Sequence, residues 1–247
     1  MIDRLSVLAL VTARGGSAGL PRKNLREVGG KTLLVRAVEA GQGAATVDRV
    51  VLSSDDPEII QAAILAGCDV PFLRPAGLAS DQARSIDVVR HALKTLTEGY
   101  DLVVLLQPTS PLRSAGDVEA AIELCVRHGA PACVSVCAAD KPPFWMHGLD
   151  ERLRLQPILP EYQRASRRQD LPQAFAVNGA VYVARTDWIM AQDSFIGPKT
   201  IGYVMPRERS IDIDDELDLV IAEALAARSS RSPGPAVAWP PAAARRT

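Results

Sequence analysis

The sequence is poor in the residues that build disulfide frameworks, zinc sites and membrane spans. Among its 247 residues are only 4 cysteines, without a Cys-x-x-Cys pair, and only 3 histidines, which lie far apart. A disulfide scaffold and a histidine-rich zinc site are therefore not expected. No apolar run has the length of a membrane span. We expect a protein that is not bound to a membrane, located in the cytoplasm, with reduced thiols.

An excess of charge of one sign is also missing. The chain has 28 Lys and Arg residues against 29 Asp and Glu residues, for a net charge of −1. No global basic field would attract nucleic acid, so we expect no nucleic-acid partner. With 47% hydrophobic residues the chain is able to bury one main core, predicted over residues 1–228. Pro, Ala, Ser and Arg dominate residues 229–247, which predicts a disordered tail.

A glycine-rich, cation-bearing segment, residues 11–25, directly follows the apolar run Leu5–Leu10. Glycines let such a turn fold tightly with its amides pointing inward, and the cations supply charge. An apolar strand that ends in this way presents N–H groups and positive charge to a phosphate. We predict that the segment binds a triphosphate. Its glycines and cations are Arg14, Gly15, Gly16, Gly19, Arg22 and Lys23.

Two other motifs compete for the same segment. A Walker A loop does not fit, because Gly30-Lys31-Thr32 would require its first glycine at Leu25. Residues 15–19 also match the Gly-x-Ser-x-Gly elbow of α/β-hydrolases, with Ser17 as the nucleophile. Pro21 follows too closely for the helix that an elbow needs, so a serine hydrolase is the weaker alternative. An ordinary surface turn is the third.

Helical and strand patterns alternate along the chain, which predicts an α/β fold with a mostly parallel sheet. The run 101–106 is apolar throughout, as in a strand buried on both faces, and should be central. Asp55 and Asp56 suggest either a metal pair or a helix N-cap, and Asp56-Pro57-Glu58 favours the cap. Helices are predicted over 31–45, 85–96 and 115–128, and strands over 49–53, 70–73, 132–137, 177–183 and 201–205.

The segment 107–113, Gln-Pro-Thr-Ser-Pro-Leu-Arg, follows the central strand. Ligands of open α/β sheets bind outside the carboxyl ends of the strands, so these polar side chains should lie beside the first loop. A simple strand-to-helix connector is the alternative. The next irregular segment, 138–175, contains five prolines and scattered apolar residues, which indicates an extended arm packed on a second subunit.

Residues 210–215 alternate as Ser-Ile-Asp-Ile-Asp-Asp, which predicts a strand with Asp212 and Asp214 on one face. Mg²⁺ favours one or two carboxylates completed by phosphate and water, so this pair is a candidate metal site, with an exposed strand face as the alternative. Asp215 should cap a final helix. The inward stripe of that helix is predicted as Leu217, Val220, Ile221, Ala224 and Leu225.

Six motifs in order resemble the acylneuraminate cytidylyltransferases, which are the CMP-sialic acid synthetases and their bacterial relatives. They are the segments 13–24, 73–81, 106–113, 168–172, 178–182 and 210–214. The resemblance implies a Rossmann-like, three-layer nucleotidyltransferase fold and a homodimer built by the arm. It also implies coupling of CTP, with Mg²⁺ or Mn²⁺, to the anomeric hydroxyl of a 2-keto-3-deoxy sugar acid. A non-catalytic CTP sensor on the same scaffold is the alternative.

The resemblance also assigns roles to residues. Nucleotide binding falls to Arg14, Gly15, Gly16, Ser17, Lys23, Asn24, Arg74 and Ser85, and acceptor binding to Gln107, Thr109, Ser110, Asn178 and, from the partner subunit, Arg168. Asp212 and Asp214 would hold the metal and act in catalysis with Arg14 and Lys23. Ala18 replaces a usual lysine, which removes one cation from the phosphate loop. Ala176 replaces a frequent arginine, and together with Trp145 it would make the sugar pocket less cationic and more apolar, so we expect a nonulosonate of the legionaminic or pseudaminic type at least as readily as sialic acid.

Overall fold

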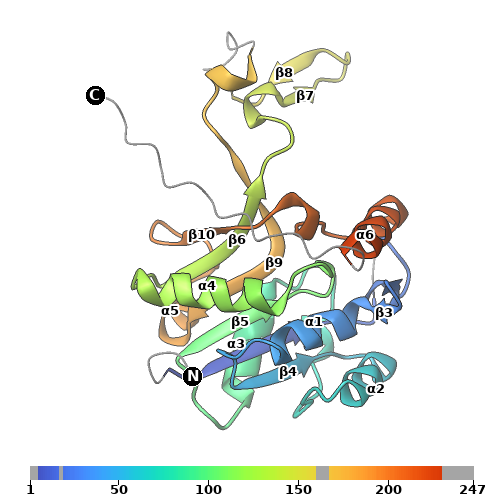
Figure 1. The fold of residues 1–247 in the computed structure, drawn as a ribbon, viewed down its shortest axis with the longest axis vertical. Coiled ribbons are helices and arrows are strands. Elements are labelled where there is room, and N and C mark those ends of the chain that lie inside the picture. Colours follow the sequence, from blue (N-terminus) through green and yellow to red (C-terminus); the bar gives the residue numbers. More distant parts are fainter. Residues whose placement is uncertain (1–4, 17–18, 160–166, 230–247) are drawn as a thin grey trace.

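A six-stranded sheet forms the middle of the protein (Figure 1). The computed structural model describes residues 5–16, 19–159 and 167–229. Only β9 runs antiparallel to its neighbours, so the prediction of a mostly parallel sheet is confirmed. The central position of the run 101–106 is confirmed as well. In spatial order the strands are β10 (Ile201–Val204), β6 (Ala132–Ala138), β9 (Phe175–Arg185), β5 (Leu102–Leu106), β1 (Val7–Thr12) and β4 (Arg49–Ser53).

Helices cover both faces of this sheet. Val7, Ala9 and Val11 of β1 belong to the buried cluster shared with α1 (Leu33–Gln42), α2 (Pro57–Leu65) and α4 (Ala115–Arg127). Leu8 and Leu10 belong to the opposite cluster, shared with α3 (Ser85–Thr95) and α5 (Thr186–Ala191). Successive strand residues point to opposite faces, so an unbroken apolar run supplies both cores. The three-layer architecture is therefore confirmed.

Local capping fixes where several helices begin. Asp56 accepts hydrogen bonds from the amides of Glu58 and Ile59, which confirms the predicted N-cap of α2. Asp215 accepts from the amides of Leu217 and Asp218, so it caps the last helix, α6 (Glu216–Ser229), as predicted. No helix in the described part of the chain is both long and apolar enough to cross a membrane.

Two predicted strands are wrong. Residues 70–73 form no strand, and only an isolated bridge joins neighbouring Asp69 to Val51 of β4. Pro71 has no backbone N–H group to donate to a β-ladder at this position. Residues 210–215 form an irregular loop after the 3-10 helix η6 (Arg207–Arg209), because its amides bind partners outside any sheet, as in the 2.8 Å bond from Ile213 N to the Thr109 carbonyl.

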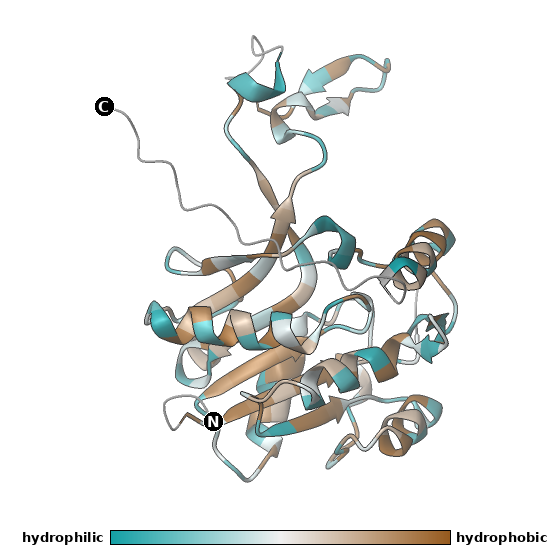
Figure 2. Ribbon diagram, viewed as in Figure 1, coloured by the Kyte–Doolittle hydropathy of each residue, from teal (hydrophilic) through white to brown (hydrophobic). Residues whose placement is uncertain are grey.

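The predicted inward stripe of α6 is also wrong. Leu219 and Ala222 are the buried residues of the helix, whereas Leu217 and Val220 are 65% and 64% exposed. The helix packs on a small hairpin, β2 (Glu27–Val28) and β3 (Lys31–Thr32), with one side only. Its other apolar side chains therefore stay exposed. Figure 2 shows the apolar residues of α6 in brown.

An arm projects from the body beyond the ends of β6 and β9 (Figure 1). It carries the hairpin of β7 (His147–Leu149) and β8 (Leu155–Pro157) with the 3-10 helices η3 (Pro143–Trp145) and η5 (Arg168–Asp170). Leu149, Leu153 and Leu155 are largely exposed on it. The extended arm is confirmed in the described residues, and its contact with a second subunit stays a prediction. Residues 160–166 of the arm and the tail 230–247 lie outside the described residues.

Candidate active site

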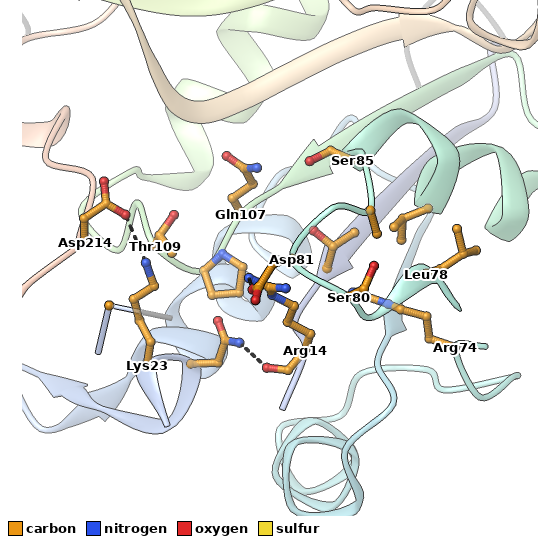
Figure 3. A pocket seen from close by; sticks show the side chains of 16 residues that line it. Arg14, Lys23, Arg74, Leu78, Ser80, Asp81, Ser85, Gln107, Thr109 and Asp214 are labelled. Carbon is orange, nitrogen blue, oxygen red and sulfur yellow. Dashed lines mark hydrogen bonds and ion pairs between the residues drawn. The ribbon is translucent and has the colours of Figure 1, made fainter. Parts of the chain in front are cut away.

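A cavity of about 430 Å³ opens at the carboxyl ends of β1 and β5 (Figure 3). Arg14 reaches it from the segment after β1, and Lys23 from the following 3-10 helix, η1 (Lys23–Leu25). Gln107 and Thr109 reach it from the segment after β5. The predicted meeting of the first loop with the segment 107–113 is thus confirmed, because parallel strands end at the same edge of the sheet.

Among the described residues, three cationic side chains line this cavity. The guanidinium of Arg14 lies 2.6 Å from the Asp81 carboxylate, and the Lys23 ammonium lies 3.1 Å from that of Asp214. Both carboxylate partners are more than two thirds exposed, so these pairs contribute little and phosphate oxygens are able to replace them. Arg74 is buried against the Ser53 hydroxyl at 3.0 Å, and burial lowers its pKa to about 10.

Asn24 lies at the cavity, as predicted, whereas Arg22 turns away from it. The Asn24 amide is buried and donates to the Arg14 carbonyl at 2.9 Å, so it fixes the loop that carries Arg14 while also lining the cavity. Arg22 does not line the cavity. Its guanidinium turns to Asp56 and Glu58, and the residue has a left-handed backbone with φ of 56°.

The glycine loop departs from the predicted phosphate cradle. The Gly15 amide donates to the Asp55 carboxylate at 3.2 Å, and neither Gly15 nor Gly16 lines the cavity. A Cβ at Gly15 would lie 2.5 Å from an Asp56 oxygen, so the glycine permits close approach of two protein segments. Gly19 does line the cavity. Ser17, the predicted nucleophile of the hydrolase alternative, and Ala18 lie outside the described residues.

Ser110 and Asn178, which were predicted to bind the acceptor, are buried and bind one another, so their contact with an acceptor stays a prediction. The Ser110 hydroxyl donates to the Asn178 carbonyl at 3.2 Å. The Asn178 side chain accepts from Ser135 at 2.6 Å and donates to the Ser210 hydroxyl at 2.9 Å. A side chain whose polar groups are hydrogen-bonded inside the protein holds strands in place and has few free donors or acceptors for a ligand. Both residues therefore position the site.

Asp214 lines the cavity from the irregular loop before α6, and Asp212 lies two residues earlier in the same loop without lining it. An ideal Cβ on Gly179 would lie 3.1 Å from Asp212 Oδ2 and 3.2 Å from Gln107 Oε1, which places Asp212 beside Gln107. Burial raises the pKa of Asp212, and the charge of Asp214 raises it further. The alternation of burial predicted for this segment survives without a strand: Ile213 is buried, whereas Asp212 and Asp214 are exposed as whole residues. Only the carboxylate end of Asp212 is desolvated, close to Gly179.

Mg²⁺ takes carboxylate oxygens together with phosphate and water, so Asp212 and Asp214 would suit a magnesium ion once Lys23 leaves Asp214. In the described residues no group of three or more His, Cys, Asp or Glu side chains is arranged to hold a metal alone. A metal at this edge would therefore depend on the substrate for its coordination.

Two further residues beneath the site were missed from the sequence. Asp117 is buried and accepts hydrogen bonds from Arg209 Nε and Nη2, each at 2.8 Å. This pair anchors the segment that leads to Asp212. Burial alone would raise the pKa of Asp117, but hydrogen bonds from Arg209 and Ser114 outweigh it and lower the pKa. The Ser-x-x-Asp spacing of Ser114 and Asp117 is a capping-box signal that was available in the sequence. Nothing in the sequence pairs Asp117 with Arg209.

A second cavity of about 190 Å³ adjoins the first and shares Ser85 and Gln107 with it. Tyr182 and Phe195 line it, and neither was predicted as a site residue because they come from separate elements. Arg168 lines neither cavity. It lies on the arm and donates to the Ala139 carbonyl at 3.2 Å, so its predicted role in a partner's site stays a prediction.

A mostly parallel sheet with cations gathered at its carboxyl edge defines an α/β nucleotide-binding protein. Residues 8–136 match the family model described as Cytidylyltransferase. The pseudaminic acid cytidylyltransferase of Campylobacter jejuni is 33% identical over 221 residues, which cover 88% of this chain and 95% of that protein. The chain belongs to the cytidylyltransferase family.

Other similarities agree with this membership. The N-acylneuraminate cytidylyltransferase of Escherichia coli is 31% identical over 229 residues, 92% of this chain, and the chain spans only 54% of that protein's length. A solved CMP:2-keto-3-deoxy-manno-octonic acid synthetase complexed with CTP superposes with a TM-score of 0.66 at 20% identity. That structure covers 91% of this chain, and 99% of it is covered in turn. It confirms the predicted nucleotidyltransferase fold.

Proposed function

We propose that this protein transfers CMP from CTP to the anomeric hydroxyl of a 2-keto-3-deoxy sugar acid of the nonulosonate class and releases pyrophosphate. The observation that carries the proposal is a pair of cavities that share Ser85 and Gln107 in their linings. One is cationic and lined by Arg14 and Lys23, and the other is more apolar and lined by Tyr182 and Phe195. Relatives named for pseudaminic acid and N-acylneuraminate support the acceptor class.

The cationic cavity takes the nucleotide. Arg14 and Lys23 leave their exposed carboxylate partners and bind phosphate oxygens, while Arg74 and Ser85 line the part that receives the base. Arginine grips two oxygens and lysine acts as a compact charge, so together they follow charge that moves from the α-phosphate to the leaving pyrophosphate.

The second cavity takes the acceptor. Its aromatic walls suit the acyl and deoxy groups of a nonulosonate, and Gln107 stands between the two substrates. Trp145 and Ala176, which the sequence suggested for this pocket, line neither cavity. Ala176 instead lines a groove that also includes Met146 of the arm and Ile221 of α6.

In the reaction the oxygen of the anomeric hydroxyl attacks the α-phosphorus, its proton passes to an aspartate of this edge or to water, and the bond from the α-phosphorus to pyrophosphate breaks. Little covalent chemistry falls to the protein, so positioning and neutralisation of charge supply the catalysis. Asp212 and Asp214 would hold Mg²⁺ or Mn²⁺, which would neutralise phosphate charge when bound. The buried Arg113 supports this edge from below, since it donates to the carbonyls of Gln107 and Ala180.

A homodimer belongs to the same proposal. The exposed apolar side chains of the arm favour burial against a second copy, and Arg168 on that arm would then enter the partner's acceptor side.

The test is pyrophosphate release from CTP with a panel of sialic, legionaminic, pseudaminic and octulosonic acids, with the CMP-sugar identified by mass. We expect coupling of at least one nonulosonate and weaker coupling of the octulosonate. Burial of one added methyl is worth only about 1 kcal/mol, so discrimination among nonulosonates should be modest. CTP binding without pyrophosphate release from any acid would favour a sensor and refute the enzyme.

A further inference from the structure

The second cavity is closed on one side by a loop, residues 192–200, between α5 and β10. Phe195 of this loop is buried, and its ring centroid lies 5.4 Å from that of Tyr182. The loop contains no helix or strand, so side-chain contacts determine where it lies. Thr200 fixes its far end, since its hydroxyl donates to the Phe195 carbonyl at 3.0 Å.

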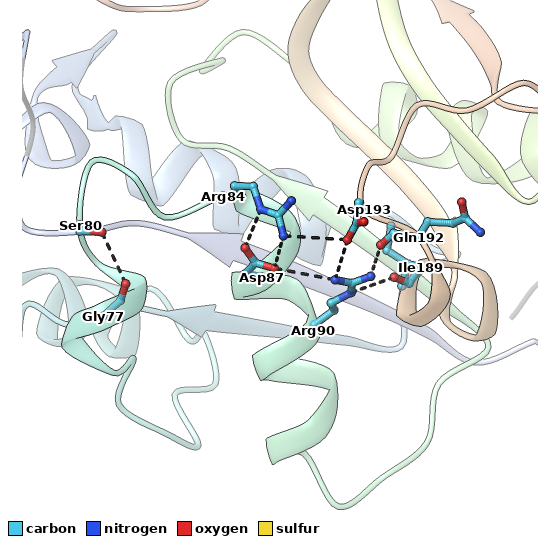
Figure 4. Close-up of polar contacts among 8 residues, drawn as sticks. All are labelled: Gly77, Ser80, Arg84, Asp87, Arg90, Ile189, Gln192 and Asp193. Atoms are coloured by element: carbon cyan, nitrogen blue, oxygen red, sulfur yellow. Dashed lines mark hydrogen bonds and ion pairs between the residues drawn. The ribbon is translucent and has the colours of Figure 1, made fainter.

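Arg90 of α3 fixes the near end (Figure 4). Its Nε donates to the Ile189 carbonyl at 3.2 Å, and a terminal nitrogen donates to the carbonyl of Gln192. The last carbonyls of a helix have no partner within the helix, and α5 is only six residues long. A planar guanidinium with several donors is suited to binding these carbonyls together.

The same guanidinium faces a carboxylate that lines the cavity. Arg90 lies 3.4 Å from Asp193 Oδ1, whereas Arg84 lies 4.0 Å from it and is engaged mainly with Asp87 at 2.8 Å. A sugar acid brings its own carboxylate, and an unpaired Asp193 would repel it. Arg90 therefore both anchors the loop and offsets the charge of Asp193.

We propose that Arg90 is the positioning residue of the acceptor-binding loop, so that it determines affinity for the sugar acid without affecting CTP. Arg90 lines neither cavity. Its effect passes through Asp193 and Phe195 to the acceptor side. The inference rests on the proposed function, because it assumes that the second cavity takes the acceptor.

The test compares Arg90→Met with Arg84→Met as a matched control from the same charge cluster. Loss of about one charge-assisted hydrogen bond should raise the acceptor KM about tenfold in Arg90→Met. The Kd for CTP should stay within about twofold, and hydrogen exchange should accelerate in residues 192–200 but not in β5. In Arg84→Met, which keeps every carbonyl contact of the loop, we expect all three quantities to stay within about twofold of wild type.

An unchanged acceptor KM in Arg90→Met, or a parallel rise in the Kd for CTP, would overturn the inference. Should that variant fail to fold, Arg90→Lys carries the same test, since an ammonium cannot bind two carbonyls and Asp193 in one fork. Wild-type exchange and wild-type acceptor KM in Arg90→Lys would then overturn it. Wild-type protein inactive with every sugar acid would instead refute the proposed function.

Discussion

Replacement of Gly179 by alanine tests the geometry of the site most directly. Gly179 has a φ of 73°, and an added Cβ would lie 3.1 Å from both Asp212 Oδ2 and Ser110 Oγ. It would also lie 3.2 Å from Gln107 Oε1, so one methyl group would crowd three side chains of the site at once. Gly30 offers a matched control, because its φ is 72° and nothing lies within 4 Å of its Cβ position.

The comparison of Gly179→Ala with Gly30→Ala separates two effects, backbone strain and crowding of neighbouring side chains. A left-handed backbone costs alanine about 1–2 kcal/mol, which both variants bear and which should lower Tm by about 2–8 °C. Only at Gly179 must neighbours also give way, by a few tenths of an ångström. A displacement of about 1 Å in an active site costs about a hundredfold in rate, so roughly tenfold is expected from this smaller shift.

The assay is kcat for pyrophosphate release, together with thermal unfolding of both variants. We expect similar losses of Tm, with turnover about tenfold lower in Gly179→Ala and near wild type in Gly30→Ala. Equal turnover in the two variants would refute the view that Asp212, Gln107 and the Gly179 turn form one tightly packed catalytic edge.

Four further predictions concern charge. Arg14→Ala and Lys23→Ala should each lower turnover on the order of a hundredfold, and near-wild-type pyrophosphate release would remove the cationic cavity from catalysis. Asp214→Asn should remain folded by circular dichroism yet lose Mg²⁺-dependent activity, whereas full activity in excess EDTA would contradict a metal role. Mixing Arg168→Ala subunits with Asp214→Asn subunits should restore activity in some heterodimer sites if the arm reaches the partner's site. No recovery of activity despite demonstrated subunit exchange would exclude a shared site. Asp117 has a lowered pKa, so the stability that it contributes is present above the ordinary aspartate pKa and is lost as pH falls through the lowered value. In Asp117→Asn the free energy of unfolding should drop by about 3 kcal/mol at neutral pH. Its dependence on acid pH should also become weaker than in the wild type.

The layered fold was accessible from the sequence because strong local signals agreed with it. The unbroken run of β5 and the Asp56-Pro57 start of α2 each reflect a short-range physical requirement, burial on two faces and helix capping. The cationic cavity was accessible for a related reason, since strands of known direction bring their following loops to one edge.

Other features depend on partners that are distant in the chain. The face that α6 buries is decided by the β2–β3 hairpin, so its own apolar periodicity pointed to the wrong side. The loop 210–215 kept its alternation of burial but not its strand, because Thr109 and Asp218 took its amides. Periodicity records which residues are buried more faithfully than it records the hydrogen bonds of the backbone.

The residues assigned to the acceptor divide along the same line. Gln107 and Thr109 face the cavity, while Ser110, from the same motif, binds Asn178 of another motif in the interior. A motif fixes which residues occur together, but only the turn of the backbone decides which of them faces a ligand. At this edge that turn is made by Gly179, whose missing side chain leaves room for Asp212 against Gln107. The chemistry of the edge therefore depends as much on a side chain that is absent as on the carboxylates and amides that surround it.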